Sequence, residues 1–210
     1  MILNQLEFLL MNNPVRASVQ KYFEGPRLER MGGVMAGGCA LEIGCGRGVG
    51  VEIILDRFGA TRVDAVDLDP RMIRRAQKRL KGRPARLWVA DATHLEVDDS
   101  TYAAAFDFGV IHHIADWRKA LGEIWRVLKP GGRFYVEEAL CDIISRRLCR
   151  ALFDHPWEDR FDHLQFIAGL RQAGFRVLVT KQIWNRLGWY VAQKTTHENE
   201  GNKGPGERDS

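Results

Sequence analysis

The sequence has no long hydrophobic run, only four cysteines, and no basic leader at its start. No apolar stretch approaches the roughly 20 residues that a membrane-spanning helix needs, so we expect no membrane span. The N-terminus begins Met-Ile-Leu-Asn-Gln-Leu-Glu, without the basic segment that opens a secretory signal. The cysteines form no C-x-x-C pair and lack the spacing of zinc ligands. These absences predict reduced thiols, a cytoplasmic protein and no metal site.

A strong excess of charge of one sign is also missing, since the net charge is +4. The basic residues gather in residues 71–86 and 146–150 without an aromatic RNA-binding motif between them. This pattern favours solvated helix faces over a nucleic-acid interface. Binding of RNA to the first basic segment stays an alternative, which strong salt dependence of binding would support.

The length of 210 residues favours one domain. We predict a single domain over residues 1–194, with N-terminal helices over 1–31 that Gly25-Pro26 interrupts, a helical insertion or lid over 139–161, and a disordered polar tail over 195–210.

Between these segments, short apolar runs alternate with amphipathic helical patterns. Strands are predicted over 39–43, 62–67, 85–89, 102–107 and 133–137, helices over 49–58, 70–80, 117–128 and 161–173, and a terminal hairpin over 175–180 and 187–193. Alternation with short connections indicates an α/β fold, a doubly wound, Rossmann-like and mostly parallel sheet with helices on both faces.

The most specific motif follows the first predicted strand, where glycines stand at positions 44, 46, 48 and 50. A dinucleotide fingerprint reads G-x-G-x-x-G, but Val49 stands where its third glycine belongs. Glu42 precedes the glycines by two residues. A carboxylate there suits the ammonium of an amino acid joined to adenosine better than it suits a pyrophosphate, which prefers amides at a helix N-terminus.

Two further acids follow the next two predicted strands. Asp67 ends the second strand, where a carboxylate accepts both hydroxyls of a ribose. Asp69 then caps a helix that starts at Pro70. Asp91, next to Ala92 after the third strand, suits an adenine amino group. The alternative for both acids is a plain turn residue.

Four segments together resemble the ordered motifs of class I S-adenosylmethionine-dependent methyltransferases, and in particular the small ubiquinone/menaquinone-biosynthesis-like enzymes. They are residues 42–48, 66–70, 90–92 and 126–132, and the resemblance covers roughly residues 38–138. It implies a seven-stranded sheet with an antiparallel last strand and S-adenosyl-L-methionine as cofactor. By the same resemblance Gly44, Cys45, Gly46 and Gly48 line the methionine part, Asp67 the ribose, and Asp91 with Ala92 the adenine. Leu68 is a further candidate for binding the cofactor.

The fourth strand departs from the family pattern, because Tyr102-Ala103 stands where the family has an acid. Asp107 and Phe108 then fall at the carboxyl end of that strand, where the resemblance places the sulfonium. We include both among the candidate cofactor-binding residues.

Methyl transfer is an in-line displacement, to which a general base contributes when the acceptor must lose a proton. The candidate bases are His112 and His113, since imidazole titrates near neutrality. The alternative is that one of them packs or caps the helix that begins near Asp116. Glu137 and Glu138 should face opposite sides of the fifth strand, either toward the cavity or as solvated acids.

The sequence therefore predicts a methyltransferase that acts on a small-molecule acceptor by O-, N- or C-methylation, as a monomer or homodimer. The segment over 139–161 and the N-terminal helices would build the acceptor pocket. Three alternatives stay open: a non-catalytic methyltransferase-like binding module, an RNA methyltransferase and an NAD-dependent oxidoreductase.

Overall fold

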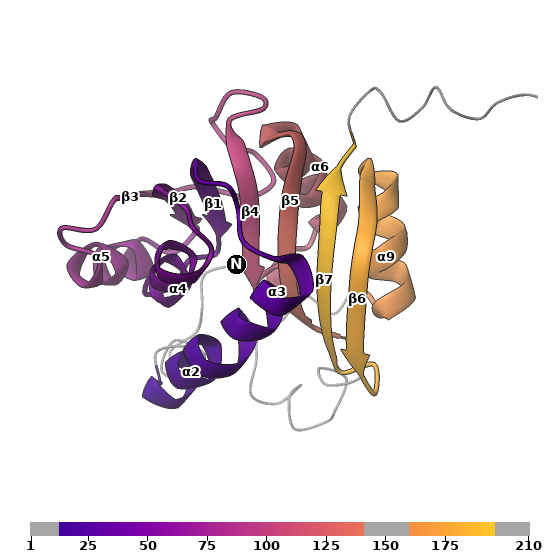
Figure 1. Cartoon of the computed structure of the whole chain (residues 1–210), viewed down its shortest axis with the longest axis horizontal. Helices are drawn as coiled ribbons and strands as arrows, with labels where there is room; N and C mark the ends of the chain where they lie inside the picture. The colour runs from indigo at the N-terminus through magenta and orange to yellow at the C-terminus, as the bar shows by residue number, and fades with distance from the viewer. Residues whose placement is uncertain (1–12, 141–159, 196–210) are drawn as a thin grey trace, which may run out of the picture.

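The computed structural model describes residues 13–140 and 160–195 and contains a seven-stranded sheet in the order β3-β2-β1-β4-β5-β7-β6 (Figure 1). Strands β1 to β5 pair in parallel, and β7 lies antiparallel between β5 and β6. The predicted α/β class, with a mostly parallel Rossmann-like sheet and an antiparallel last strand, is confirmed.

The strands are β1 Cys39–Ile43, β2 Arg62–Asp67, β3 Ala85–Val89, β4 Tyr102–Phe108, β5 Leu128–Ala139, β6 Phe175–Ile183 and β7 Leu187–Lys194. The α-helices are α2 Pro14–Val19, α3 Gly25–Gly32, α4 Val49–Arg57, α5 Pro70–Arg79, α6 Trp117–Val127 and α9 His163–Gln172.

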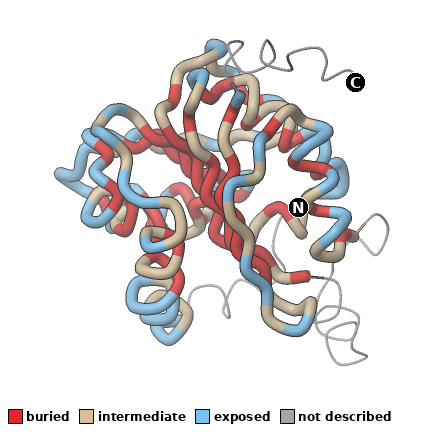
Figure 2. The backbone as a smooth tube through the Cα atoms, turned by 45° about the vertical axis from the view of Figure 1, so that its right-hand side comes forward, coloured by how far each residue is buried: buried red, intermediate tan, exposed pale blue. Residues whose placement is uncertain are grey.

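Helices cover both faces of the sheet and divide the core in two. On one face α3, α4 and α5 pack against the sheet around Leu28, Ile54 and Phe58, and on the other α6 and α9 pack around Trp117 and Phe166. The central strands are therefore buried on both sides, as Figure 2 shows along the middle of the sheet. This double burial explains their nearly continuous apolar sequences.

Side-chain caps fix where several helices begin. Asn13 accepts from the Val15 amide and Asp69 from the Arg71 amide, each just before a proline in the first turn. Asp116 caps α6, and Asp162 forms a capping box with Gln165 at the start of α9. These bonds satisfy amides that have no partner within the helix.

The prediction that Gly25-Pro26 interrupts the N-terminal helix is wrong. Helical structure continues through a π-helical turn, Gln20–Glu24, in which the Gly25 amide donates to the Gln20 carbonyl. The wider turn accommodates Pro26, which has no N–H to donate. Glycine is required at 25 because a Cβ there would lie 2.6 Å from Cγ2 of Ile53 on α4.

The fifth strand is longer than predicted. Helix α6 ends at Val127 and β5 begins at once, so residues 129–132 lie within the strand, beside an irregularity in its register with β4. The interpretation of Glu137 and Glu138 as solvated acids is wrong, because both side chains are buried.

Some predictions fall on residues that the structure does not describe. They concern the first helix of the N-terminal pair (residues 1–12), most of the insertion or lid (141–159) and the tail (196–210). Within residues 13–140 and 160–195, no helix has the length and apolar character that crossing a membrane requires.

Candidate active site

The glycine loop after β1 turns sharply into α4. The Cys45 amide donates to the Val66 carbonyl on β2 at 2.9 Å, which fixes the loop against its neighbour. A Cβ atom added at Gly44 would lie 2.3 Å from Val110, and one added at Gly48 would lie 2.8 Å from Leu80. At Gly50 it would lie 1.9 Å from the Glu42 carboxylate. At Gly46 nothing lies within 4 Å. Three glycines are thus needed for packing, and Gly46 leaves space for a ligand at the backbone.

Asp67 ties this loop to the end of β2. Its Oδ2 accepts from the Gly46 amide and its Oδ1 from the Asp69 amide, both at 2.8 Å. Burial raises the pKa of Asp67, and these two backbone bonds oppose the rise. A carboxylate oxygen has two acceptor positions, so each can still receive a hydroxyl.

The loop after β3 supplies the third wall. Asp91 Oδ1 accepts from the Thr93 amide at 2.8 Å, and this bond is the main cause that lowers the pKa of Asp91. Ala90 and Ala92 flank Asp91 at the same wall. Leu68, which is 38% exposed, lines the same cavity.

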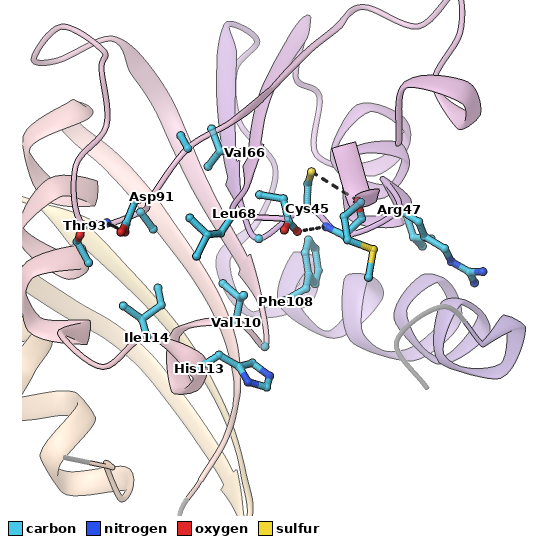
Figure 3. Close-up of a pocket in the computed structure, with 18 of the residues that line it drawn as sticks. Cys45, Arg47, Val66, Leu68, Asp91, Thr93, Phe108, Val110, His113 and Ile114 are labelled. Carbon is cyan, nitrogen blue, oxygen red and sulfur yellow. Dashed lines mark hydrogen bonds between the residues drawn. The ribbon is translucent and has the colours of Figure 1, made fainter. Parts of the chain in front are cut away.

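These loops open onto a cavity of about 750 Å³ at the carboxyl ends of the parallel strands (Figure 3). This volume lies within the range of small-molecule sites. The predicted residues that line it are Gly44, Cys45, Gly46, Asp67, Leu68, Asp91, Ala92, Phe108 and His113. Four predicted site residues do not line the cavity: Glu42, Gly48, Asp107 and His112. No described group of His, Cys, Asp or Glu is arranged to hold a metal ion.

Sequence reasoning expected the N-terminal helices beside the acceptor pocket but did not identify which of their residues line the cavity. Arg16, Ala17 and Gln20 line the cavity from α2 and the π-helical turn, and Arg47 lines it from the glycine loop. The Arg47 guanidinium donates to the Asn13 carbonyl at 3.0 Å, which joins the loop to the start of α2. No local pattern in the sequence signals a contact between segments so far apart.

Arg16 holds this wall against the end of β4. Its Nη1 donates to both carboxylate oxygens of Glu24 at 2.5 Å, and its Nη2 donates to the Phe108 carbonyl at 3.3 Å. Glu137 lies beside the pair and accepts from Trp189 Nε1 at 2.9 Å. Burial, followed by the charge of Glu24, raises the pKa of Glu137 well above its usual value. The neutral form of Glu137 leaves one carboxylate, Glu24, for one guanidinium.

His112 belongs to a second buried network behind the cavity. Its Nδ1 lies 2.5 Å from Glu138 Oε2, and Glu138 Oε1 accepts from the Ile111 amide at 2.6 Å. Burial lowers the pKa of His112 to about 4 and raises that of Glu138 to about 7. At neutral pH the imidazole is therefore uncharged.

Asp107 extends this network but faces away from the cavity. Its Oδ1 accepts from the Val110 amide at 2.9 Å. Burial, the charge of Glu138 and a hydrogen bond between the two carboxyls raise the pKa of Asp107 well above its usual value. The neighbouring Phe108, unlike Asp107, lines the cavity.

His113 occupies the cavity wall next to His112, with 4.1 Å between the ring centroids. Neither ring caps the following helix, because the cap is Asp116, whose carboxylate accepts from the Lys119 amide.

Glu42 lies behind the glycine loop, 1% exposed. Its Oε2 has no hydrogen-bond donor among the described residues. Burial, followed by the charges of Asp67 and Asp107, raises the pKa of Glu42 well above its usual value.

Comparison with known proteins agrees with this geometry. Residues 41–136 match the model of a methyltransferase domain. This segment is a class I methyltransferase domain. Over 98 residues the chain is 35% identical to an uncharacterized methyltransferase of Mycobacterium bovis, covering 47% of this chain and 49% of that protein. It is also 35% identical over 101 residues to the demethylmenaquinone methyltransferase of Thermus thermophilus, covering 47% and 46%. The matched segment spans about half the length of these curated relatives.

Solved structures share the fold of the methyltransferase domain. A chain from the complex between the Haloferax volcanii Trm112 methyltransferase activator and a methyltransferase has a TM-score of 0.74 and 21% identity, covering 90% of this chain and 98% of that one. A S-adenosylmethionine-dependent methyltransferase from Aquifex aeolicus has a TM-score of 0.70 and 19% identity, covering 90% and 97%. At this identity the likeness concerns the fold alone.

Proposed function

We propose that the methyltransferase domain binds S-adenosylmethionine and transfers its methyl group to a small-molecule acceptor, by O-, N- or C-methylation. The observation that carries this proposal is the single cavity onto which the ends of β1, β2, β3 and β4 open, with Gly46, Asp67, Asp91 and Phe108 on its walls. The name of the Thermus relative, a demethylmenaquinone methyltransferase, supports a small organic acceptor.

The residues on the walls fit this cofactor. Gly46 leaves its backbone open to a ligand, and the Asp67 oxygens keep acceptor positions for two ribose hydroxyls. Leu68 and Ala92 offer apolar surface for an adenine ring, with Asp91 at its edge. The loop spacing, with Val49 starting α4 in place of a third fingerprint glycine, disfavours the NAD alternative.

When bound, the cofactor supplies a methyl group on a sulfonium, and the chain must place an acceptor in line with it. Positioning of this kind contributes about 7–11 kcal/mol to the lowering of a reaction barrier. The part of the cavity that no cofactor motif claims includes Arg16, Ala17, Gln20 and His113, so we assign the acceptor to that part.

For acceptors that lose a proton, we propose His113 as the general base and His112 as the residue that positions it. His113 lines the cavity. The ring of His112 packs beside the ring of His113, and its Nδ1 is fixed by Glu138. Removal of a proton at the cavity wall by an imidazole is worth about 10²–10⁴-fold in rate.

The basic face of α5 gives little support to an RNA substrate. Arg71 pairs with Asp69, Arg79 with Glu52, and Arg83 in the turn after α5 with Asp56. These pairs offset part of the positive charge of this face, and none of the bases of α5 lines the cavity.

Titration calorimetry of the full chain with S-adenosylmethionine and with NADH tests the proposal, followed by a turnover assay across small-molecule acceptors. We expect binding of S-adenosylmethionine alone and methylation of at least one acceptor. Binding of NADH instead would refute the proposal. Binding of S-adenosylmethionine without turnover on any acceptor would favour the non-catalytic module.

A further inference from the structure

The buried carboxyl group of Glu42 lies directly behind the wall of the cofactor cavity. A Cβ added at Gly50 would lie 1.9 Å from Glu42 Oε1 and 2.8 Å from the ring of Phe108, so the carboxyl, the helix α4 and a cavity-lining ring meet at one place. Glu42 is 1% exposed, and no donor in the described chain reaches its Oε2. A buried acid in this state is unfavourable as an anion unless a cation is nearby.

The described chain provides no such cation. The charged groups that act on Glu42 are Asp67 at the end of β2 and Asp107 at the end of β4, both acids. The thiol of Cys45, in the loop above, is itself kept neutral, because burial and then the charge of Glu42 raise its pKa. The groups that act on Asp107 in turn are Glu138 on β5 and the uncharged His112. The charges that act on Glu42 are therefore those of acids.

We propose that Glu42 is the residue by which the site distinguishes the sulfonium donor from its thioether product, through the proton that it releases when a sulfonium binds. This inference rests on the proposed function. Without ligand the carboxyl keeps its proton. A sulfonium in the cavity stabilises the carboxylate, and the proton passes to solvent. Once the methyl group has left, the remaining thioether is neutral, and the carboxylate takes a proton back from solvent.

The direction of the pH dependence follows from this linkage. A ligand that favours the carboxylate lowers the pKa of Glu42, so binding releases a proton at pH values between the lowered and the original pKa. In that window the affinity for S-adenosylmethionine relative to S-adenosylhomocysteine rises with pH, by about tenfold per pH unit for each extra proton released. Both ligands carry the same amino-acid group, so their difference isolates the sulfonium.

Calorimetry of the full chain with each ligand, in two buffers of different ionisation enthalpy, counts the protons released. We expect more protons released with S-adenosylmethionine than with S-adenosylhomocysteine, and no excess in Glu42→Gln, whose amide cannot ionise. Asp64→Asn is the matched control, because Asp64 is also a buried acid on a neighbouring strand but is held by Arg62 and the Tyr102 hydroxyl, outside the cavity wall. It should keep the excess.

Equal proton release by the two ligands in the wild-type chain would overturn the inference and leave the proposed function standing. An excess that persists in Glu42→Gln would also overturn it, since another group would then be the source. Absence of binding by both ligands to folded wild-type protein would instead refute the proposed function, and this inference with it.

Discussion

The two ends of the cavity are built in different ways. At the proposed cofactor end, short loops directly follow β1, β2 and β3, and hydrogen bonds such as that from Gly46 to Asp67 join neighbouring strands. At the proposed acceptor end, Arg16 from α2 reaches the Phe108 carbonyl, 92 residues away in the chain. The first end depends on local backbone geometry and the second on buried ion pairs and hydrogen bonds, so mutations should affect them differently.

The largest effect should come from Gly44→Ala at the cofactor end. Gly44 has φ +61°, and its Cβ would lie 2.3 Å from Val110 Cγ2. Strain and overpacking together should lower the free energy of unfolding by about 2–5 kcal/mol and abolish cofactor binding. Denaturant unfolding and calorimetry measure both. Gly82→Ala is the control: it has φ +80° but open space around it, so about 1 kcal/mol is expected. Similar losses in both variants would show that packing at the loop is unimportant.

At the acceptor end, His113→Ala should lower turnover about 100-fold while cofactor affinity changes little. His112→Ala should also lower turnover, and in addition it leaves Glu138 without its ring partner and so reduces stability. Turnover, cofactor affinity and urea unfolding are measured on both variants. Wild-type turnover in His113→Ala would remove that residue from the mechanism, and wild-type turnover in His112→Ala would do the same for His112.

Arg16→Ala tests the contacts by which Arg16 joins α2 to the end of β4. It leaves Glu24, whose side chain is 6% exposed, without its guanidinium, and should lower the free energy of unfolding by about 2 kcal/mol. Acceptor turnover should fall more than cofactor affinity. Arg57→Ala removes the pair between Arg57 on α4 and Glu29 on α3, but both partners are more exposed, so less than about 1 kcal/mol is expected. Equal losses in the two variants would mean that Arg16 has no special role.

The smallest effect is a pH-dependent gain of stability in Glu42→Gln. The pKa of Glu42 is raised in the folded protein, so the folded state keeps a proton that the unfolded chain has released. Wild-type stability therefore falls as pH rises from the usual carboxyl pKa through the raised one, by up to about 1.4 kcal/mol per pH unit. Glutamine lacks this penalty. Melting temperatures of the unliganded proteins should diverge as pH rises, and parallel curves would contradict the assignment.

The two ends of the cavity also differ in how well their residues could be predicted from the sequence. The strands over 39–43, 62–67 and 85–89 have the predicted bounds, because apolar runs that end in glycine or acid are strong local signals. The cofactor-end residues Gly44, Asp67 and Asp91 line one cavity, as the motif spacing implied.

The N-terminal helices were expected at the proposed acceptor end, but its individual residues could not be predicted because their contacts join distant segments. A π-helical turn at Gln20–Glu24 has no sequence signature, and it brings Gln20 to the cavity and Glu24 to Arg16. Nor does alternation along β5 reveal that Glu138 is buried beside His112, since only the tertiary fold brings the turn after β4 over that strand.

The most direct test of the account is a crystal structure of the full chain with S-adenosylhomocysteine. We expect the adenosyl group between Leu68 and Ala92, the ribose hydroxyls at Asp67, and the sulfur facing the space between Phe108 and Arg16. An empty crevice in soaked and co-grown crystals, or a ligand held elsewhere on the chain, would contradict the account and leave only the α/β fold.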